Sequence, residues 1–146
     1  MARGCSPTSK AAAPCSGTRT SSPSASATRP SPLHAVGLDG VRAAGAAAAA
    51  HQAVDRLAAG GSAGFWVHLD VDVLDDALMP AVDHRIPGGL SWQELEHVLR
   101  TALADERAVG LDVTIFNPRL DPGGTIAARL AECLGRSLSA RTDHGG

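Results

Sequence analysis

Aromatic side chains are scarce in this chain, whose 146 residues are the length of one ordinary domain. Only 3% of the residues are aromatic and Tyr is absent, whereas 44% are hydrophobic. A core must therefore be built from Ala, Val, Leu and Ile. The many alanines favour helices, because alanine has the highest helix propensity. We expect one globular domain with alanine-rich helices.

Basic residues are also few in the body of the chain. The 13 Lys and Arg residues include four before residue 34, among them Lys10, the only lysine. Nine basic residues are therefore left against 15 acidic ones downstream. Nucleic-acid binding depends on clustered positive charge, which this acidic body lacks. The composition argues against a nucleic-acid partner.

Long apolar runs and cysteine motifs are missing as well. The sequence has no run of about 18 apolar residues, and its N-terminus lacks the continuous apolar segment of a secretory signal. The three cysteines, Cys5, Cys15 and Cys133, form no C-x-x-C pair and no disulfide framework. We expect a cytoplasmic protein with reduced thiols and no membrane partner.

Composition divides the chain into three parts. Residues 1–33 are rich in Ser, Pro and Ala and contain no acid. They bury too little apolar surface to offset the entropy of ordering, so they are predicted to form a disordered tail. Residues 34–140 carry the hydrophobic patterns of a folded domain. Residues 141–146 are predicted to form a flexible C-terminus.

Helix and strand patterns alternate in the folded part. The predicted helices cover residues 41–59, 91–103 and 125–138, and the predicted strands cover residues 65–73 and 108–116. The second helix has the clearest signature, because Ser91 and Glu94 form a capping box. This order favours an α/β fold with a parallel sheet covered on both faces. Ligands of such sheets bind at the carboxyl ends of the strands.

Two aspartates stand at the end of the first predicted strand. Asp70 and Asp72 are two residues apart, so on a strand both carboxylates would leave the same face. A like-charged pair among apolar neighbours is tolerated if it shares a proton or binds a hard divalent cation. We favour a metal site. The alternative is that both aspartates only cap loops.

A D-x-D pair alone does not define the chemistry. Haloacid-dehalogenase-like phosphatases also carry one, and such an enzyme would use Asp70 as its nucleophile. That alternative is weakened because no lysine follows the motif to hold phosphate. A further alternative is a non-catalytic α/β module that associates with a complete homologue.

The longer context extends the pattern. Residues 68–95 read HLDVDVLDDALMPAVDHRIPGGLSWQEL, and residues 110–121 read GLDVTIFNPRLD. This stretch resembles the second-half metal signature of the ureohydrolases, the family of arginase, agmatinase and formimidoylglutamase. The matching positions are Asp70, Asp72, Leu74, Asp75, Pro80, Pro87, Gly88, Gly89 and Leu90.

The resemblance implies a three-layer α/β/α fold with a mostly parallel sheet. It also implies two Mn²⁺ ions that activate a bridging hydroxide for hydrolysis of a guanidino or formimidoyl C–N bond. Asp70 and Asp72 match metal-ligand positions. The family's other ligands, in the motifs G-G-D-H and D-A-H-x-D, are absent from this sequence. We therefore interpret the chain as a truncated or degenerate member, and the activity of the isolated chain and its assembly into a homo-oligomer stay open.

The resemblance to the ureohydrolases also bears on how many metal ions the chain holds and on its substrate. Two carboxylates do not satisfy two ions, so we predict that the chain holds at most one Mn²⁺ well. The substrate is expected to be a small guanidino or amidine compound other than arginine. The acid that many members use to hold the guanidinium aligns with Ile115, which cannot pair with a cation.

Further candidate residues surround the two aspartates, and no catalytic residue is assigned. His68 and Asp112 are predicted to support the ligands by hydrogen bonds. Gly88 and Gly89 are predicted to let the loop backbone approach the site. The remaining candidates either face the substrate or belong to an ordinary solvated loop, and they are Asp75, Asp83, His84 and Arg85.

Overall fold

The computed structural model describes residues 34–142, with side chains described as far as residue 139. The predicted tail, residues 1–33, lies outside the described residues, as do residues 143–146. The helices and strands are α1 (Leu38–Ala44), α2 (Ala46–Ala59), β1 (Phe65–Asp70), α3 (Trp92–Ala104), β2 (Ala108–Thr114) and α4 (Thr125–Thr142). Two 3-10 turns, η1 (Val71–Val73) and η2 (Pro118–Leu120), follow the two strands.

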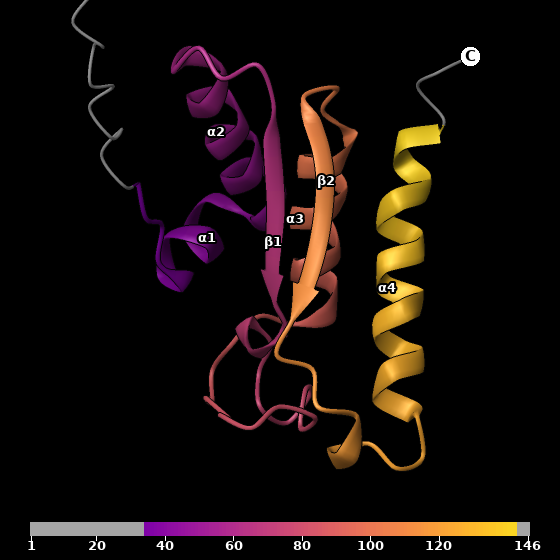
Figure 1. Cartoon of the computed structure of the whole chain (residues 1–146). Helices are drawn as coiled ribbons and strands as arrows, with labels where there is room; N and C mark the ends of the chain where they lie inside the picture. Colours follow the sequence, from indigo (N-terminus) through magenta and orange to yellow (C-terminus); the bar gives the residue numbers. More distant parts are fainter. Residues whose placement is uncertain (1–33, 143–146) are drawn as a thin grey trace, which may run out of the picture. The chain divides into compact units, whose positions relative to one another are not determined.

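The sheet consists of β1 and β2, which run parallel. Phe65 pairs with Ala108 at one end of the sheet, and Asp70 pairs with Thr114 at the other. Figure 1 shows α3 behind the two strands, and α3 packs against both α2 and α4. The arrangement is a β-α-β unit, as the alternation of sequence patterns predicted. Among the described residues no helix is long and apolar enough to cross a membrane.

Helix α3 supplies the middle of the core. Leu95, Leu99 and Leu103 recur every four residues and are buried. Burial of each such side chain contributes about 1.5–3 kcal/mol. The predicted capping box is confirmed, since the Glu94 N–H donates to Ser91 Oγ (3.2 Å) and the Ser91 N–H donates to Glu94 Oε2 (2.8 Å).

The core continues into the loop that follows β1. Val71, Leu74 and Met79 are buried there, in the same cluster as Leu69 and the leucines of α3. Apolar side chains therefore anchor this loop at several points, although it has little regular structure. Its position beside the carboxyl end of the sheet is set by packing.

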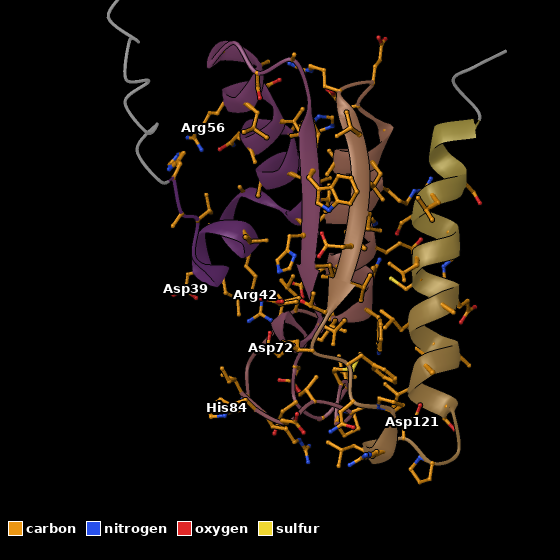
Figure 2. All side chains as sticks on the ribbon, in the orientation of Figure 1. Asp39, Arg42, Arg56, Asp72, His84 and Asp121 are labelled. Carbon is orange, nitrogen blue, oxygen red and sulfur yellow. The ribbon has the colours of Figure 1, made fainter. Side chains whose placement is uncertain are left out.

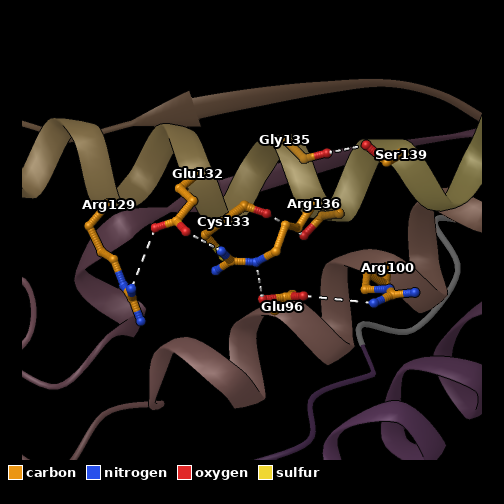
Figure 3. A network of polar contacts seen from close by, with 9 residues as sticks. Glu96, Arg100, Arg129, Glu132, Cys133, Gly135, Arg136 and Ser139 are labelled. Atoms are coloured by element: carbon orange, nitrogen blue, oxygen red, sulfur yellow. Dashed lines mark hydrogen bonds and ion pairs between the residues drawn. The ribbon is translucent and has the colours of Figure 1, made fainter.

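Helix α4 packs on α3 through Leu130 and Cys133, which are buried. Ion pairs border this contact (Figure 3). Arg136 lies 2.9 Å from Glu96 of α3 and 2.6 Å from Glu132. Exposed pairs of this kind contribute at most about 1 kcal/mol each. Apolar burial therefore outweighs them in holding the two helices together.

The predicted continuous helix over residues 41–59 is wrong. The helical segment begins earlier, at Leu38, and breaks at Gly45, whose φ of 87° lies in the left-handed region. A glycine adopts this conformation without the clash that a Cβ would cause. The break separates α1 from α2.

Both predicted strands are too long. The first ends at Asp70, because the backbone turns into η1 and Leu74 N–H donates to the Val71 carbonyl. The second ends at Thr114, because Ile115 has a φ of 61°. Asp70 and Asp72 therefore do not share one strand face. The final helix extends to Thr142, which is beyond its predicted end and within the predicted C-terminal segment.

Helices cover only one face of the sheet within residues 34–142. Leu69 points into the core, whereas Trp66 on the opposite face keeps 59% of its surface exposed. The sequence predicted helices on both faces of the sheet. In the described part of the chain, helices cover one face. The exposed face carries the side chains of the candidate site.

Candidate functional site

A row of polar side chains crosses the exposed face of the sheet. It consists of Trp66, His68 and Asp70 from β1 with Asp112 and Thr114 from β2, and we call it the polar row. These residues alternate along each strand and therefore point to one side. His68 is paired with Asp112 and Asp70 with Thr114 in the strand register. The sheet itself brings these side chains together.

The contacts in the polar row are continuous. The indole N–H of Trp66 donates to Oδ1 of Asp112, whose Oδ2 lies 2.6 Å from Nδ1 of His68. The other ring nitrogen of His68, Nε2, lies 3.2 Å from Oδ1 of Asp70. That same oxygen accepts a hydrogen bond from the Thr114 hydroxyl. Every member is thus linked to the candidate ligand Asp70, directly or through a neighbour.

The polar row shifts the pKa values of its members. The hydrogen bond to Asp112 raises the pKa of His68, and the charge of Asp70 adds to this effect. Asp112 has a lowered pKa, chiefly because the Trp66 indole donates to it and then because of His68. The predicted supporting residues His68 and Asp112 therefore each favour the charged form of the other, beside Asp70.

Asp70 and Asp72 both line one pocket of about 540 Å³ at the carboxyl end of β1. Asp70 reaches it from the last position of the strand, and Asp72 reaches it from η1. Figure 2 shows Asp72 at this end of the sheet, next to the loop. The other lining residues are Val36, Leu38, Val41, Val73 and residues 86–90. The pocket combines two carboxylates with mainly apolar walls.

Asp75 closes the loop that borders this pocket. Its Oδ1 accepts from the Ala77 N–H at 3.0 Å, and its Oδ2 accepts from the Gly88 N–H at 2.8 Å. These two bonds, with Gly88 the larger cause, lower the pKa of Asp75. Both of its oxygens are occupied by backbone groups. The geometry gives Asp75 a role in loop closure.

The two glycines bring the loop backbone close to the strand end. Leu90 N–H donates to the Val73 carbonyl at 2.8 Å, and Asp75 N–H donates to the Leu90 carbonyl at 3.0 Å. A Cβ on Gly89 would lie 2.4 Å from the carbonyl carbon of Leu74, and Gly88 has a φ of 84°. Only glycine satisfies both positions, and both residues line the pocket.

Arg42 of α1 joins the loop to α3. Its Nη2 donates to the Gly89 carbonyl at 3.0 Å, and its Nε donates to Glu94 Oε1 at 3.2 Å. The same Glu94 caps α3, so one arginine connects the helix cap and the loop around Gly88 and Gly89, which we call the glycine loop. Sequence analysis missed this residue because its partners lie 47 and 52 positions away.

The remaining loop candidates differ in their surroundings. Asp83 accepts from the Asn117 side chain at 2.7 Å, which ties the loop to the segment after β2. Arg85 donates to the Asp76 carbonyl at 2.8 Å, within its own loop. His84 is exposed on the outer side of the loop (Figure 2). None of these three lines the pocket described above.

Carboxylate oxygens suit a hard or borderline cation such as Mn²⁺, so the chemistry of Asp70 and Asp72 fits a metal site. The number of donors is small, however. Within residues 34–142 no group of three or more His, Cys, Asp and Glu side chains is placed to hold a metal ion. The described residues therefore bring together only the two candidate carboxylates at this pocket.

Sequence analysis also missed Trp66 and Thr114. Both occupy the same alternating positions as His68, Asp70 and Asp112, and this alternation was the available signal. The missing information was the register of the two strands, because it decides which positions face each other.

Comparison with known proteins gives one consistent family. A model of the arginase family matches residues 4–140. Over 81 residues the chain is 41% identical to "Arginase 1, mitochondrial" of Arabidopsis thaliana, and the match covers 56% of this chain and 23% of that protein. The chain thus spans about a quarter of the length of the curated relatives it matches.

Solved structures of known proteins are also similar to this chain. The proclavaminate amidino hydrolase of Streptomyces clavuligerus is similar with a TM-score of 0.63 and 30% identity, over 75% of this chain and 35% of that one. The Trypanosoma cruzi formiminoglutamase with Mn²⁺ is similar with a TM-score of 0.62 and 25% identity, over 72% and 33%. These similarities confirm the predicted α/β class.

Proposed function

Because the chain belongs to the arginase family, as the motifs in residues 68–121 predicted, we propose that it carries part of the active site of a metal-dependent hydrolase of linear amidines. One observation carries the proposal: Asp70 and Asp72 line the same pocket at the carboxyl end of β1. This is the edge where parallel α/β sheets bind their ligands. The formiminoglutamase to which the chain is similar contains Mn²⁺.

In this proposal Asp70 and Asp72 hold a Mn²⁺ ion through carboxylate oxygens. The ion, when bound, would lower the pKa of water and polarise the carbon of the amidine. Gly88, Gly89 and apolar side chains form the other walls of the pocket. His68 and Thr114 contact Asp70, and Asp112 holds His68. Asp75 and Arg42 hold the loop.

The small number of donors limits what the described residues do alone. Mn²⁺ prefers several oxygen or nitrogen ligands in a fixed geometry, and only two carboxylates meet at the pocket. We therefore propose that the chain by itself holds at most one Mn²⁺ well. This is the behaviour expected of residues that supply only part of a metal-ligand set.

The substrate proposed is a small guanidino or amidine compound that needs no carboxylate partner at position 115. Ile115 follows β2 directly and is 47% exposed, and its side chain is apolar. It cannot pair with the cationic guanidinium of arginine. Arginine is accordingly expected to be a poor substrate.

The phosphatase alternative is less well supported. A phosphate group carries negative charge, and its binding requires cationic or N–H donors. The side chains that line the pocket include two carboxylates and no Lys, Arg or His. This charge pattern favours a cation over a phosphate, and it agrees with the family match.

The test is a measurement of Mn²⁺ binding to the full chain. Binding is monitored by the decrease of the electron paramagnetic resonance signal of free Mn²⁺. Asp70→Asn and Asp72→Asn should each abolish the binding seen in the wild type. Asp39→Asn is the matched control, because Asp39 is an exposed acid on α1 that does not line the pocket. Equal binding by all four proteins would show that these aspartates are not ligands.

A further inference from the structure

One oxygen of Asp70 is occupied and the other is not. Oδ1 accepts from the Thr114 hydroxyl and lies 3.2 Å from His68 Nε2. Within the described residues Oδ2 has no hydrogen-bond partner. Asp70 lines the pocket, so Oδ2 is the oxygen left for a ligand there.

Trp66 fixes the side chains at the end of the polar row that is farther from Asp70. Its ring lies against Gly110, where a Cβ would come within 2.2 Å of a ring atom, so only glycine admits the indole in this position. The indole N–H then occupies Oδ1 of Asp112. Oδ2 of Asp112 is left for His68 Nδ1 at 2.6 Å, which orients the imidazole toward Asp70.

From these contacts we propose that Thr114 and Trp66 are positioning residues that hold the Asp70 side chain in one χ1 rotamer, with Oδ2 of its carboxylate free for a metal ion. Thr114 acts on Asp70 directly. Trp66 acts through Asp112 and His68. The inference rests on the proposed function, because it concerns the orientation of the metal ligand named there.

A hydrogen bond from Thr114 removes rotational freedom that the carboxylate would otherwise lose on binding the metal. Pre-orientation of this kind raises metal affinity, and loss of a supporting hydrogen bond typically weakens it about 10- to 100-fold. The row also joins the two strands, so a purely structural role has to be separated from positioning. Stability and orientation are therefore measured independently.

The first measurement needs no metal. NMR couplings of Asp70 in the full chain report whether χ1 adopts one rotamer. We expect one rotamer in the wild type and in Thr114→Ser, which keeps the hydroxyl, and averaging in Thr114→Val, which keeps the shape but not the donor. Trp66→Phe should produce partial averaging. Thr101→Val on α3 is the control for loss of a hydroxyl outside the polar row.

The second measurement is Mn²⁺ affinity of the same variants, with thermal unfolding as the check on folding. Thr114→Val should bind Mn²⁺ about 10- to 100-fold more weakly, and Thr114→Ser should restore binding. A single Asp70 rotamer in Thr114→Val would overturn the inference. Ordered Asp70 rotamers with no Mn²⁺ binding by the wild type would instead support the positioning and refute the proposed metal site.

Discussion

The N–H of Gly88 donates to Oδ2 of Asp75 across 2.8 Å, and this bond joins the two ends of the loop beside the pocket. The carboxylate also accepts from Ala77, and both hydrogen bonds favour its ionised form. The position of the glycine loop therefore depends on the charge of one side chain that is not itself in the pocket.

The first prediction concerns the effect of acidic pH on the hydrogen bond between Asp75 and Gly88. The Asp75 pKa is lowered in the fold, so its stabilising effect is present above the usual aspartate pKa of about 3.9 and is lost as pH falls through the lower folded value. The Gly88 amide resonance should shift, and its hydrogen exchange should become less protected, over that acidic range. In Asp75→Ala, which has no side-chain acceptor, the Gly88 amide should be unprotected already at neutral pH. A Gly88 amide that behaves alike in both proteins would contradict the loop-closing role.

The second prediction compares two glycines. Gly89→Ala places a Cβ within 2.6 Å of three backbone atoms and should destabilise the fold by about 2–3 kcal/mol. Gly135→Ala, in α4, meets no atom within 4 Å and should stabilise the fold by about 0.5–1 kcal/mol, because alanine is the better helix former. Denaturant unfolding of both variants tests the difference. Equal effects would rule out the close approach at Gly89.

The third prediction concerns the start of α3. Ser91→Ala removes the side chain that accepts from Glu94 N–H and should cost about 1 kcal/mol of unfolding free energy. Gln93→Ala changes an exposed residue of the same helix and should have little effect. If the two variants unfold at the same denaturant concentration, the capping box contributes nothing.

The fourth prediction concerns the end of β2. Ile115 is β-branched and has a φ of 61°, a conformation that Asn tolerates far better. Ile115→Asn should therefore raise the unfolding free energy by about 1 kcal/mol. Ile86→Asn, at another exposed isoleucine without positive φ, should give no such gain. A loss of stability at position 115 would mean that its side chain packs more than its exposure indicates.

Local patterns predicted much of this structure. The capping box at Ser91 and the apolar spacing of α3 depend on residues within one helix, and both were confirmed. The alternation of helix and strand also sufficed for the α/β class. The placement of Asp70 beside the glycine loop followed from family motifs.

Features set by single backbone angles or by distant partners were not predictable. The break at Gly45 and the strand end before Ile115 both depend on positive φ, which the sequence permits but does not require. Arg42 and Trp66 act on residues more than 40 positions away. Their roles follow from helix packing and strand register.

We propose that Asp70 and Asp72 are the ligands of a partial metal site in this chain. Calorimetric titration of the full chain with Mn²⁺, combined with an assay of urea release from arginine, tests it most directly. We expect at most one weakly held ion per chain, lost in Asp72→Ala, and negligible arginine hydrolysis. Tight binding of two Mn²⁺ ions per chain, with arginine turnover abolished by Asp72→Ala, would contradict the proposal.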